Sequence, residues 1–239
     1  MKLLMASTGE SFIADSSKDL HTRHGFVKAS ELQAAKPGAL LQSNTGKKFY
    51  VLSAGFQDLY RRIRRGPQII SPKDIAAIIA ETGIGKGSTV VDAGAGSGAL
   101  ACFLANIVKK VVTYETRKDF AGIAEQNARR LGLKNMAVKN ESIAEVSERN
   151  VDLVCLDLPE PWNFIEPVRS ALKPGGFLVS YSPHAHQVQE FVTKLPDAFI
   201  HIRTIEVIQR NWLVDPQRLR PENTGLLHTG FLTFARRLS

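Results

Sequence analysis

A run of small and β-branched residues, VVDAGAGSGAL from Val90 to Leu100, constrains the fold of this chain most. Two valines before an acid are typical of the end of a buried strand, and the apolar pattern that begins at Leu100 indicates the helix that follows. The three glycines therefore lie in a strand-to-helix turn. Because glycine has no Cβ atom, such a turn can take positive φ angles and bring main-chain amides against a ligand at a helix N-terminus.

A second strand pattern, Val111 to Tyr114, is followed by Glu115. An acid about twenty residues beyond the glycine turn is where a doubly wound fold binds ribose hydroxyls, so we expect a ribonucleoside site. The glycines also satisfy the loose dinucleotide pattern GxGxx(G/A), which leaves an NAD-linked dehydrogenase open. Asp92 is not part of that pattern. An acid followed by GxGxG resembles the cofactor loop of class I S-adenosylmethionine-dependent methyltransferases.

Strand and helix patterns alternate along the remainder of the chain, which predicts an α/β fold with a mostly parallel, Rossmann-like sheet and helices on both faces. The expected strands are 89–92, 111–114, 136–139, 151–156 and 177–181, and the expected helices are 100–108, 119–131 and 164–172. KPGG at 173–176 is expected to turn the chain before the strand at 177. Residues 200–209 and 229–236 are expected to add an antiparallel edge.

The sequence before this region predicts a separate, smaller unit. Short strand patterns at 3–5, 12–14, 25–28 and 49–52 are broken by KPGAL and NTGKK turns, so we interpret residues 1–57 as a small β domain. Residues 58–74 are interpreted as a linker and the start of the first helix, which Pro72 opens. Residues 75–239 are then the cofactor-binding domain.

Composition excludes some classes of protein. Of the 239 residues 44% are hydrophobic, but no apolar run approaches the roughly twenty residues that cross a bilayer, and no secretion signal is evident. We therefore expect a cytoplasmic protein with no membrane segment. Cys102 and Cys155 stand alone in apolar segments, a spacing that predicts buried free thiols and no metal site.

The net charge of +8 favours a polyanionic partner. Four arginines gather in RRIRR at 61–65, close to the junction between the two expected domains, and further arginines enrich the C-terminal end. Guanidinium groups bind phosphates bidentately, so Arg61 and Arg62 are candidate contacts to a nucleic acid.

The segment VDLVCLDLPEPW, 151–162, is a buried strand pattern that ends in Asp157. Two prolines follow, which cannot continue a hydrogen-bonded ladder. Since ligands of open α/β sheets bind beyond the carboxyl ends of the strands, Asp157 is expected near the reactive end of a bound cofactor. Trp162 offers either a flat surface for a base or an apolar plug for the core.

Six motifs together resemble the tRNA adenine-58 N1-methyltransferase family. They cover nearly the whole chain, and the small β domain with HTRHGFV at 21–27 fits the same family. DLPEPW, PKD and the C-terminal HTGF are the most specific of them. The motifs are GPQIISPKDIA, VVDAGAGSGAL, YETRKDF, DLPEPW, LKPGGFLVSYSP and HTGFLTFARR.

The resemblance implies transfer of a methyl group from S-adenosyl-L-methionine to N1 of adenine 58 in the tRNA T-loop, or of adenines 57 and 58, by a homotetramer. It implies that Asp157 is the catalytic aspartate, and that the cofactor is bound by Gln68, Asp92, Gly94, Gly96, Ser97, Gly98, Glu115, Glu141 and Asp157. Glu115 would hold the ribose and Glu141 the adenine amino group. Many members have an aromatic residue or histidine where this chain has Ser71, so Tyr181 or Trp162 would have to contact the target base.

Two alternatives use the same residues differently. The chain could methylate another RNA or another base, or it could be a nucleic-acid-binding module without catalysis. Transfer of methyl to RNA distinguishes the enzyme from the binding module, and nicotinamide binding would identify the dehydrogenase.

Overall fold

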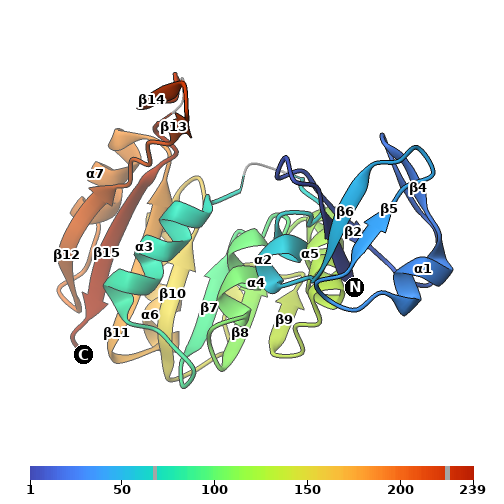
Figure 1. Cartoon of the computed structure of the whole chain (residues 1–239). Coiled ribbons are helices and arrows are strands. Elements are labelled where there is room, and N and C mark those ends of the chain that lie inside the picture. Colours follow the sequence, from blue (N-terminus) through green and yellow to red (C-terminus); the bar gives the residue numbers. More distant parts are fainter. Residues whose placement is uncertain (67–68, 224–226) are drawn as a thin grey trace. The chain divides into compact units, whose positions relative to one another are not determined.

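The computed structural model of the chain describes residues 1–66, 69–223 and 227–239. These residues form two compact units, Met1–Ile63 and Arg64–Ser239 (Figure 1). The smaller unit contains an antiparallel sheet in the order β2-β1-β6-β5 and a separate β3–β4 hairpin. Leu4, Leu32 and Phe49 are completely buried in its core. Its elements are β1 (Lys2–Met5), β2 (Ser11–Ala14), β3 (Leu20–Thr22), β4 (Gly25–Val27), α1 (Ala29–Ala34), β5 (Leu40–Gln42), β6 (Lys48–Ser53) and α2 (Phe56–Tyr60).

The larger unit is built on a seven-stranded sheet in the order β12-β15-β11-β10-β7-β8-β9. The five strands from β11 to β9 run parallel, whereas β15 runs antiparallel to both of its neighbours. The predicted antiparallel edge is therefore present. The strands are β7 (Thr89–Ala93), β8 (Lys110–Tyr114), β9 (Met136–Lys139), β10 (Val151–Leu156), β11 (Leu172–Ser182), β12 (Phe199–Glu206) and β15 (Phe231–Arg237).

Helices cover both faces of this sheet, as the alternating pattern predicted (Figure 1). Successive residues of one strand pack into different cores: Val90 contacts the core under α3 and α4, and Val91 contacts the core under α6 and α7. This alternation is what a parallel strand buried on both faces requires. The helices are α3 (Pro72–Thr82), α4 (Ala99–Ala105), α5 (Lys118–Leu131), α6 (Ile165–Ala171) and α7 (Ala185–Thr193), with 3-10 turns at Ile143–Glu145 and Pro161–Phe164.

The order of the strands reverses beside β7. The chain runs from β7 outward to β8 and β9, then returns to β10 on the other side of β7. In open α/β sheets ligands bind at this reversal, beyond the carboxyl ends of the strands. Here those ends are followed by the glycine loop after β7, by Glu115 after β8 and by Asp157 after β10.

Three local differences separate the structure from the sequence expectations. KPGG does not precede the strand but lies within β11, where the pairing with β10 jumps from Val151–Leu172 to Leu153–Phe177, so the extra residues bulge out of the ladder. The helix expected over 100–108 ends at Ala105. The antiparallel hairpin of β13 (Trp212–Asp215) and β14 (Arg218–Pro221) lies in a region for which no strand was expected.

Two further observations concern the cysteines and membrane-spanning helices. Cys102 and Cys155 are buried, free thiols. Among the described residues no helix has both the length and the apolar character needed to cross a membrane.

Candidate active site

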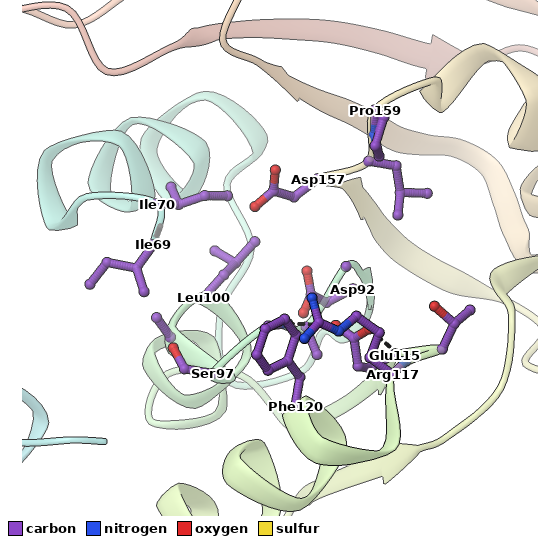
Figure 2. A pocket seen from close by; sticks show the side chains of 16 residues that line it. Ile69, Ile70, Asp92, Ser97, Leu100, Glu115, Arg117, Phe120, Asp157 and Pro159 are labelled. Carbon is purple, nitrogen blue, oxygen red and sulfur yellow. Dashed lines mark hydrogen bonds between the residues drawn. The ribbon is translucent and has the colours of Figure 1, made fainter. Parts of the chain in front are cut away.

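A cavity of about 450 Å³ lies at the reversal of the sheet (Figure 2). Three carboxylates, Asp92, Glu115 and Asp157, line it from the ends of neighbouring strands. Ile69, Ile70 and Leu100 supply an apolar wall. The other lining residues are Gly94, Ala95, Gly96, Ser97, Ala99, Thr116, Arg117, Phe120, Leu158 and Pro159.

The glycine loop forms one wall because its backbone takes conformations that side chains disfavour. Gly94 has φ +88°, and a Cβ atom there would stand 2.0 Å from the carbonyl oxygen of Asp157. Gly98 has φ +75° and directly precedes α4; its Cβ would lie 2.9 Å from that of Ala124. Both positions therefore exclude any larger residue, and the loop is held tightly between the Asp157 loop and α5.

Glu115 closes the glycine loop from the end of β8. One carboxylate oxygen accepts the Gly96 N–H at 2.9 Å, and the other accepts the Arg117 N–H at 2.9 Å. Asn140 donates its side-chain amide to the Glu115 carbonyl oxygen at 2.7 Å. The side chain is buried but still lines the cavity, so its remaining lone pairs can accept hydrogen bonds from a ligand.

Asp92 has one carboxylate oxygen with a partner and one without. Thr113 donates to Oδ2 at 2.6 Å, whereas Oδ1 is buried and has no hydrogen-bond partner among the described residues. Burial, with a smaller contribution from the charge of Glu115, raises the pKa of Asp92 to about 6. A buried acceptor without a donor leaves a hydrogen-bonding position that a ligand or an ordered water can fill. Ser97 Oγ, in the same loop, is likewise buried without a partner.

Asp157 lies beyond the end of β10, and its main-chain N–H donates to the Ala93 carbonyl at 2.9 Å. Burial raises the pKa of its carboxyl group to about 7, and the charges of Asp92 and Glu115 add to the shift. Three acidic groups in one low-dielectric cavity repel each other when ionised. The cavity is therefore suited to a ligand that carries positive charge.

A smaller cavity of about 60 Å³ adjoins the first and shares Gly94, Glu115 and Leu158 with it. Glu141 lines it, beside the apolar side chains of Ile143 and Phe164. Apolar walls with acidic groups at the edge suit a flat heterocycle that carries an amino group. The structure thus brings Glu141 close to the predicted cofactor residues.

The structure does not place the other predicted site residues on the walls of these cavities. Gln68 lies outside the described residues. Arg61 is exposed, whereas the Arg62 guanidinium donates to the carbonyl oxygens of Ser11 at 2.6 Å and Asp58 at 3.1 Å, inside the smaller unit. Tyr181 is buried and does not line the described cavity.

Tyr181 is instead fixed inside the core of the sheet. Its hydroxyl donates to the Thr229 carbonyl at 2.5 Å, and burial raises its pKa to about 12. Trp162 packs against the apolar core on the other face, with Lys194 Nζ 4.8 Å from the ring centroid. Ser71 donates its hydroxyl to Asp74 at 2.8 Å.

Sequence reasoning missed several residues that shape the site. Asn127 is buried on α5 and donates to the Ser97 carbonyl at 2.8 Å. Its signal was present, because a polar residue interrupts the buried alanine stripe of that helix at 121, 124 and 128. Arg117 lies over the Phe120 ring, 3.7 Å from its centroid, at the wall of the cavity (Figure 2).

Comparison with known proteins identifies the family of this chain. Residues 59–226 match the family model of the tRNA methyltransferase complex GCD14 subunit. The chain belongs to that methyltransferase family. The resemblance predicted from the sequence motifs is therefore confirmed, as is the class I methyltransferase fold.

Individual proteins similar to this chain are also named as methyltransferases. A tRNA (adenine(57)-N(1)/adenine(58)-N(1))-methyltransferase of Methanocaldococcus jannaschii is 34% identical, over 98% of this chain and 94% of the relative. The crystal structure of a tRNA (m1A58) methyltransferase of Aquifex aeolicus superposes with a TM-score of 0.84 at 25% identity and covers 100% of this chain and 96% of its own. A Thermotoga maritima structure, described as a SAM-dependent O-methyltransferase, has a TM-score of 0.89 at 35% identity and covers 100% and 92%.

Proposed function

We propose that the chain transfers a methyl group from S-adenosyl-L-methionine to N1 of adenine 58 in tRNA. The reaction class follows from the family, and both tRNA-modifying relatives methylate N1 of an adenine at this position. The observation that carries the proposal is the cavity in which Asp92, Glu115 and Asp157 converge. Such a cavity favours a cationic cofactor and leaves a carboxylate beside the reacting methyl group.

The residues present fit that cofactor. Its ammonium group can donate to the unpartnered Oδ1 of Asp92, and its carboxylate can accept from the unpartnered hydroxyl of Ser97. Glu115 would accept from the ribose hydroxyls, and Glu141 would accept from the adenine amino group in the smaller cavity. The glycine loop, with Gly94, Gly96 and Gly98, would enclose the methionine portion. When bound, the cofactor supplies an electrophilic methyl group on a sulfonium.

Asp157 has a defined chemical task in this proposal. Adenine N1 carries a lone pair at neutral pH, so no proton has to leave before the methyl group is attached, and positioning supplies much of the rate. The ring gains positive charge as the bond forms. An ionised Asp157 that accepts a hydrogen bond from N6 stabilises that charge inside a cavity of low dielectric.

The proposal also includes tRNA as the binding partner and a homotetramer as the oligomeric state. The target adenine is stacked in folded tRNA and would be flipped into the cavity at a cost of a few kcal/mol. We expect a cytoplasmic homotetramer. Relatives differ in whether adenine 58 alone or adenines 57 and 58 are named as targets, so the number of methyl groups per tRNA is to be measured.

The test is methyl transfer from labelled S-adenosylmethionine to an unmodified tRNA transcript, with the product nucleoside identified after digestion. The expected product is N1-methyladenosine. A ribose-methylated product would instead favour the O-methyltransferase chemistry named for the Thermotoga structure. A transcript with adenine 58 replaced by guanine is the substrate control.

Variants of Asp157 test the catalytic assignment. Asp157→Asn keeps the size of the side chain but removes its charge, so the transfer rate should fall by about two to three orders of magnitude while the Kd for the cofactor changes little. If Asp157→Asn lost cofactor binding and transfer equally, Asp157 would be a cofactor-binding residue and not a catalytic one.

A further inference from the structure

A short segment, Arg64 to Gly66, lies along α5 and leads to the wall of the cavity. The Arg64 N–H donates to Asn127 Oδ1 at 2.9 Å, and Asn127 Nδ2 donates back to the Arg64 carbonyl at 2.9 Å. One to two turns earlier on the same helix, Ile123 Cδ1 and Phe120 Cε1 lie 3.7 and 3.3 Å from where a Cβ of Gly66 would stand. The segment is therefore fixed against α5 at both of its ends.

Asn127 also joins this segment to the glycine loop. Its side-chain amide accepts from the Arg64 N–H and donates to the Arg64 carbonyl, and it also donates to the Ser97 carbonyl at 2.8 Å. The side chain is only 2% exposed, and both its amide N–H groups and its oxygen have partners. A buried amide with every group satisfied has one orientation. Arg64 is thereby placed at a fixed distance from the loop that lines the cavity.

Three arginines, Arg64 and Arg65 of this segment and Arg117 at the cavity wall, supply positive charge. Arg64 and Arg65 are exposed, and neither guanidinium has an ion-pair partner among the described residues. Arg117 lines the cavity, with its guanidinium stacked on Phe120 (Figure 2). It pairs with Asp119 at 3.0 Å, but both side chains are more than half exposed, so the pair contributes little and a phosphate can replace it.

We propose that Arg64, Arg65 and Arg117 form a phosphate-binding row for the RNA strand that enters the cavity, and that Asn127 is the positioning residue that presents Arg64. This rests on the proposed function. A base that leaves its stack needs backbone contacts close to the cavity, and a guanidinium can bind a phosphate through two parallel hydrogen bonds. Arg62 suits this task less well, because main-chain oxygens of the smaller unit already occupy its guanidinium.

The row is tested with Arg64→Ala, Arg65→Ala and Arg117→Ala. Arg130→Ala is the matched control, because Arg130 is exposed on the same helix but outside the cavity wall. The Kd for an unmodified tRNA transcript is measured at several KCl concentrations, and the Kd for S-adenosylmethionine by calorimetry. Each row variant should weaken tRNA binding and lower the slope of log K against log salt by about 0.7 to 0.9. Arg130→Ala should match the wild type, and Arg64→Ala and Arg65→Ala should leave cofactor binding unchanged.

Equal slopes for the wild type and all three row variants would overturn the row. Weaker cofactor binding in Arg117→Ala with unchanged tRNA affinity would assign Arg117 to the cofactor and remove it from the row. A wild-type protein that neither binds nor methylates tRNA would instead be a failure of the proposed function. The two failures are therefore distinguishable.

A double-mutant cycle tests the positioning role of Asn127. If Asn127 presents Arg64, then Arg64→Ala should have little further effect on tRNA affinity in an Asn127→Ala background. Additive effects would show that Arg64 acts independently of Asn127. Circular dichroism reports whether Asn127→Ala folds. If it does not, Asn127→Ser, which keeps a hydroxyl donor, takes its place in the cycle.

Discussion

At the scale of single residues, the site depends on carboxyl groups that the fold makes hard to ionise. Burial and mutual repulsion raise the pKa of Asp92 to about 6 and that of Asp157 to about 7. Both groups are neutral at pH values below these and charged above them. In the proposed function the cofactor's ammonium group donates to Asp92, so cofactor binding should follow the ionisation of Asp92.

The first prediction concerns this pH dependence. The affinity for S-adenosylmethionine should rise by about tenfold between pH 5 and pH 7.5, because Asp92 ionises across that range. Calorimetric titration at several pH values measures it. Asp92→Asn should bind the cofactor more weakly at pH 7.5 and show a flatter profile. An equally steep profile in Asp92→Asn would mean that another group controls binding.

The second prediction concerns Gly94. In Gly94→Ala the new Cβ would meet the Asp157 carbonyl at 2.0 Å in a backbone conformation with φ +88°, so the two loops must separate. We expect a lower melting temperature and loss of cofactor binding. Gly122→Ala is the control, because a Cβ at that helical position meets nothing within 4 Å, and it should leave stability unchanged or raise it by about 0.5 to 1 kcal/mol.

Which site residues the sequence could predict depends on where their partners are. Glu115 and Asp157 follow strand patterns directly, and the sheet order brings the ends of those strands together. Asn127 was not predicted, since its partners are main-chain groups of Arg64 and Ser97, 63 and 30 residues away. The alanine stripe of α5 indicates that Asn127 is buried, but no local pattern identifies its distant hydrogen-bond partners.

At the scale of elements, the start of α3 is tied to the chain that leads into β15. Lys73 Nζ donates to Asp74 Oδ1 at 2.8 Å and to the Thr229 hydroxyl at 2.7 Å, and that hydroxyl donates to Asp74 Oδ2 at 2.7 Å. Asp74 has no exposed surface. The Thr229 hydroxyl therefore joins two segments more than 150 residues apart, through hydrogen bonds to both members of a buried ion pair at the start of α3.

The third prediction follows from that ion pair. Asp74→Ala leaves the mostly buried ammonium of Lys73 without its counter-ion, which should lower the free energy of unfolding by about 3 kcal/mol in urea titrations. Glu190→Ala removes an exposed pair with Lys194 and should change it little. Equal effects of the two substitutions would contradict a stabilising role for the buried pair.

Long, periodic elements were predictable, whereas short or irregular ones were predicted only in part. The helices at 72–82 and 118–131 and the strands of the parallel sheet follow clear patterns. β3 and β5, with three residues each, were not expected, although β4, which is equally short, was expected within 25–28. KPGG was interpreted as a turn because of its residues, but the strand pairing on either side makes it a bulge.

At the scale of the whole molecule, the β13–β14 hairpin carries an uncovered apolar face. Trp212 pairs with Pro221 and Val214 with Leu219, so these four side chains share one face, while Arg218, Arg220 and Asp215 lie on the other. Trp212, Val214 and Leu219 are each more than half exposed. A two-stranded hairpin is marginally stable in water, so this face is a candidate contact of the proposed tetramer.

The fourth prediction tests the proposed tetramer at this hairpin. Val214→Asp combined with Leu219→Asp should lower the mass measured by light scattering, because two charges would be buried at the contact. Leu40→Asp, at an exposed apolar residue of the smaller unit, is the control and should leave the mass unchanged. An unchanged mass in the hairpin variant would remove the hairpin from the assembly. The domain boundaries expected from the sequence, after residues 57 and 74, remain a prediction.

The contact between Gly94 and the Asp157 carbonyl also limits which substitutions the cavity can accept. A main-chain contact cannot be adjusted by exchanging side chains, so the glycine loop and the loop that carries Asp157 must keep their mutual position. Substitutions that reshape the cavity must therefore fall on other parts of its wall, such as Ile69 and Ile70 before α3.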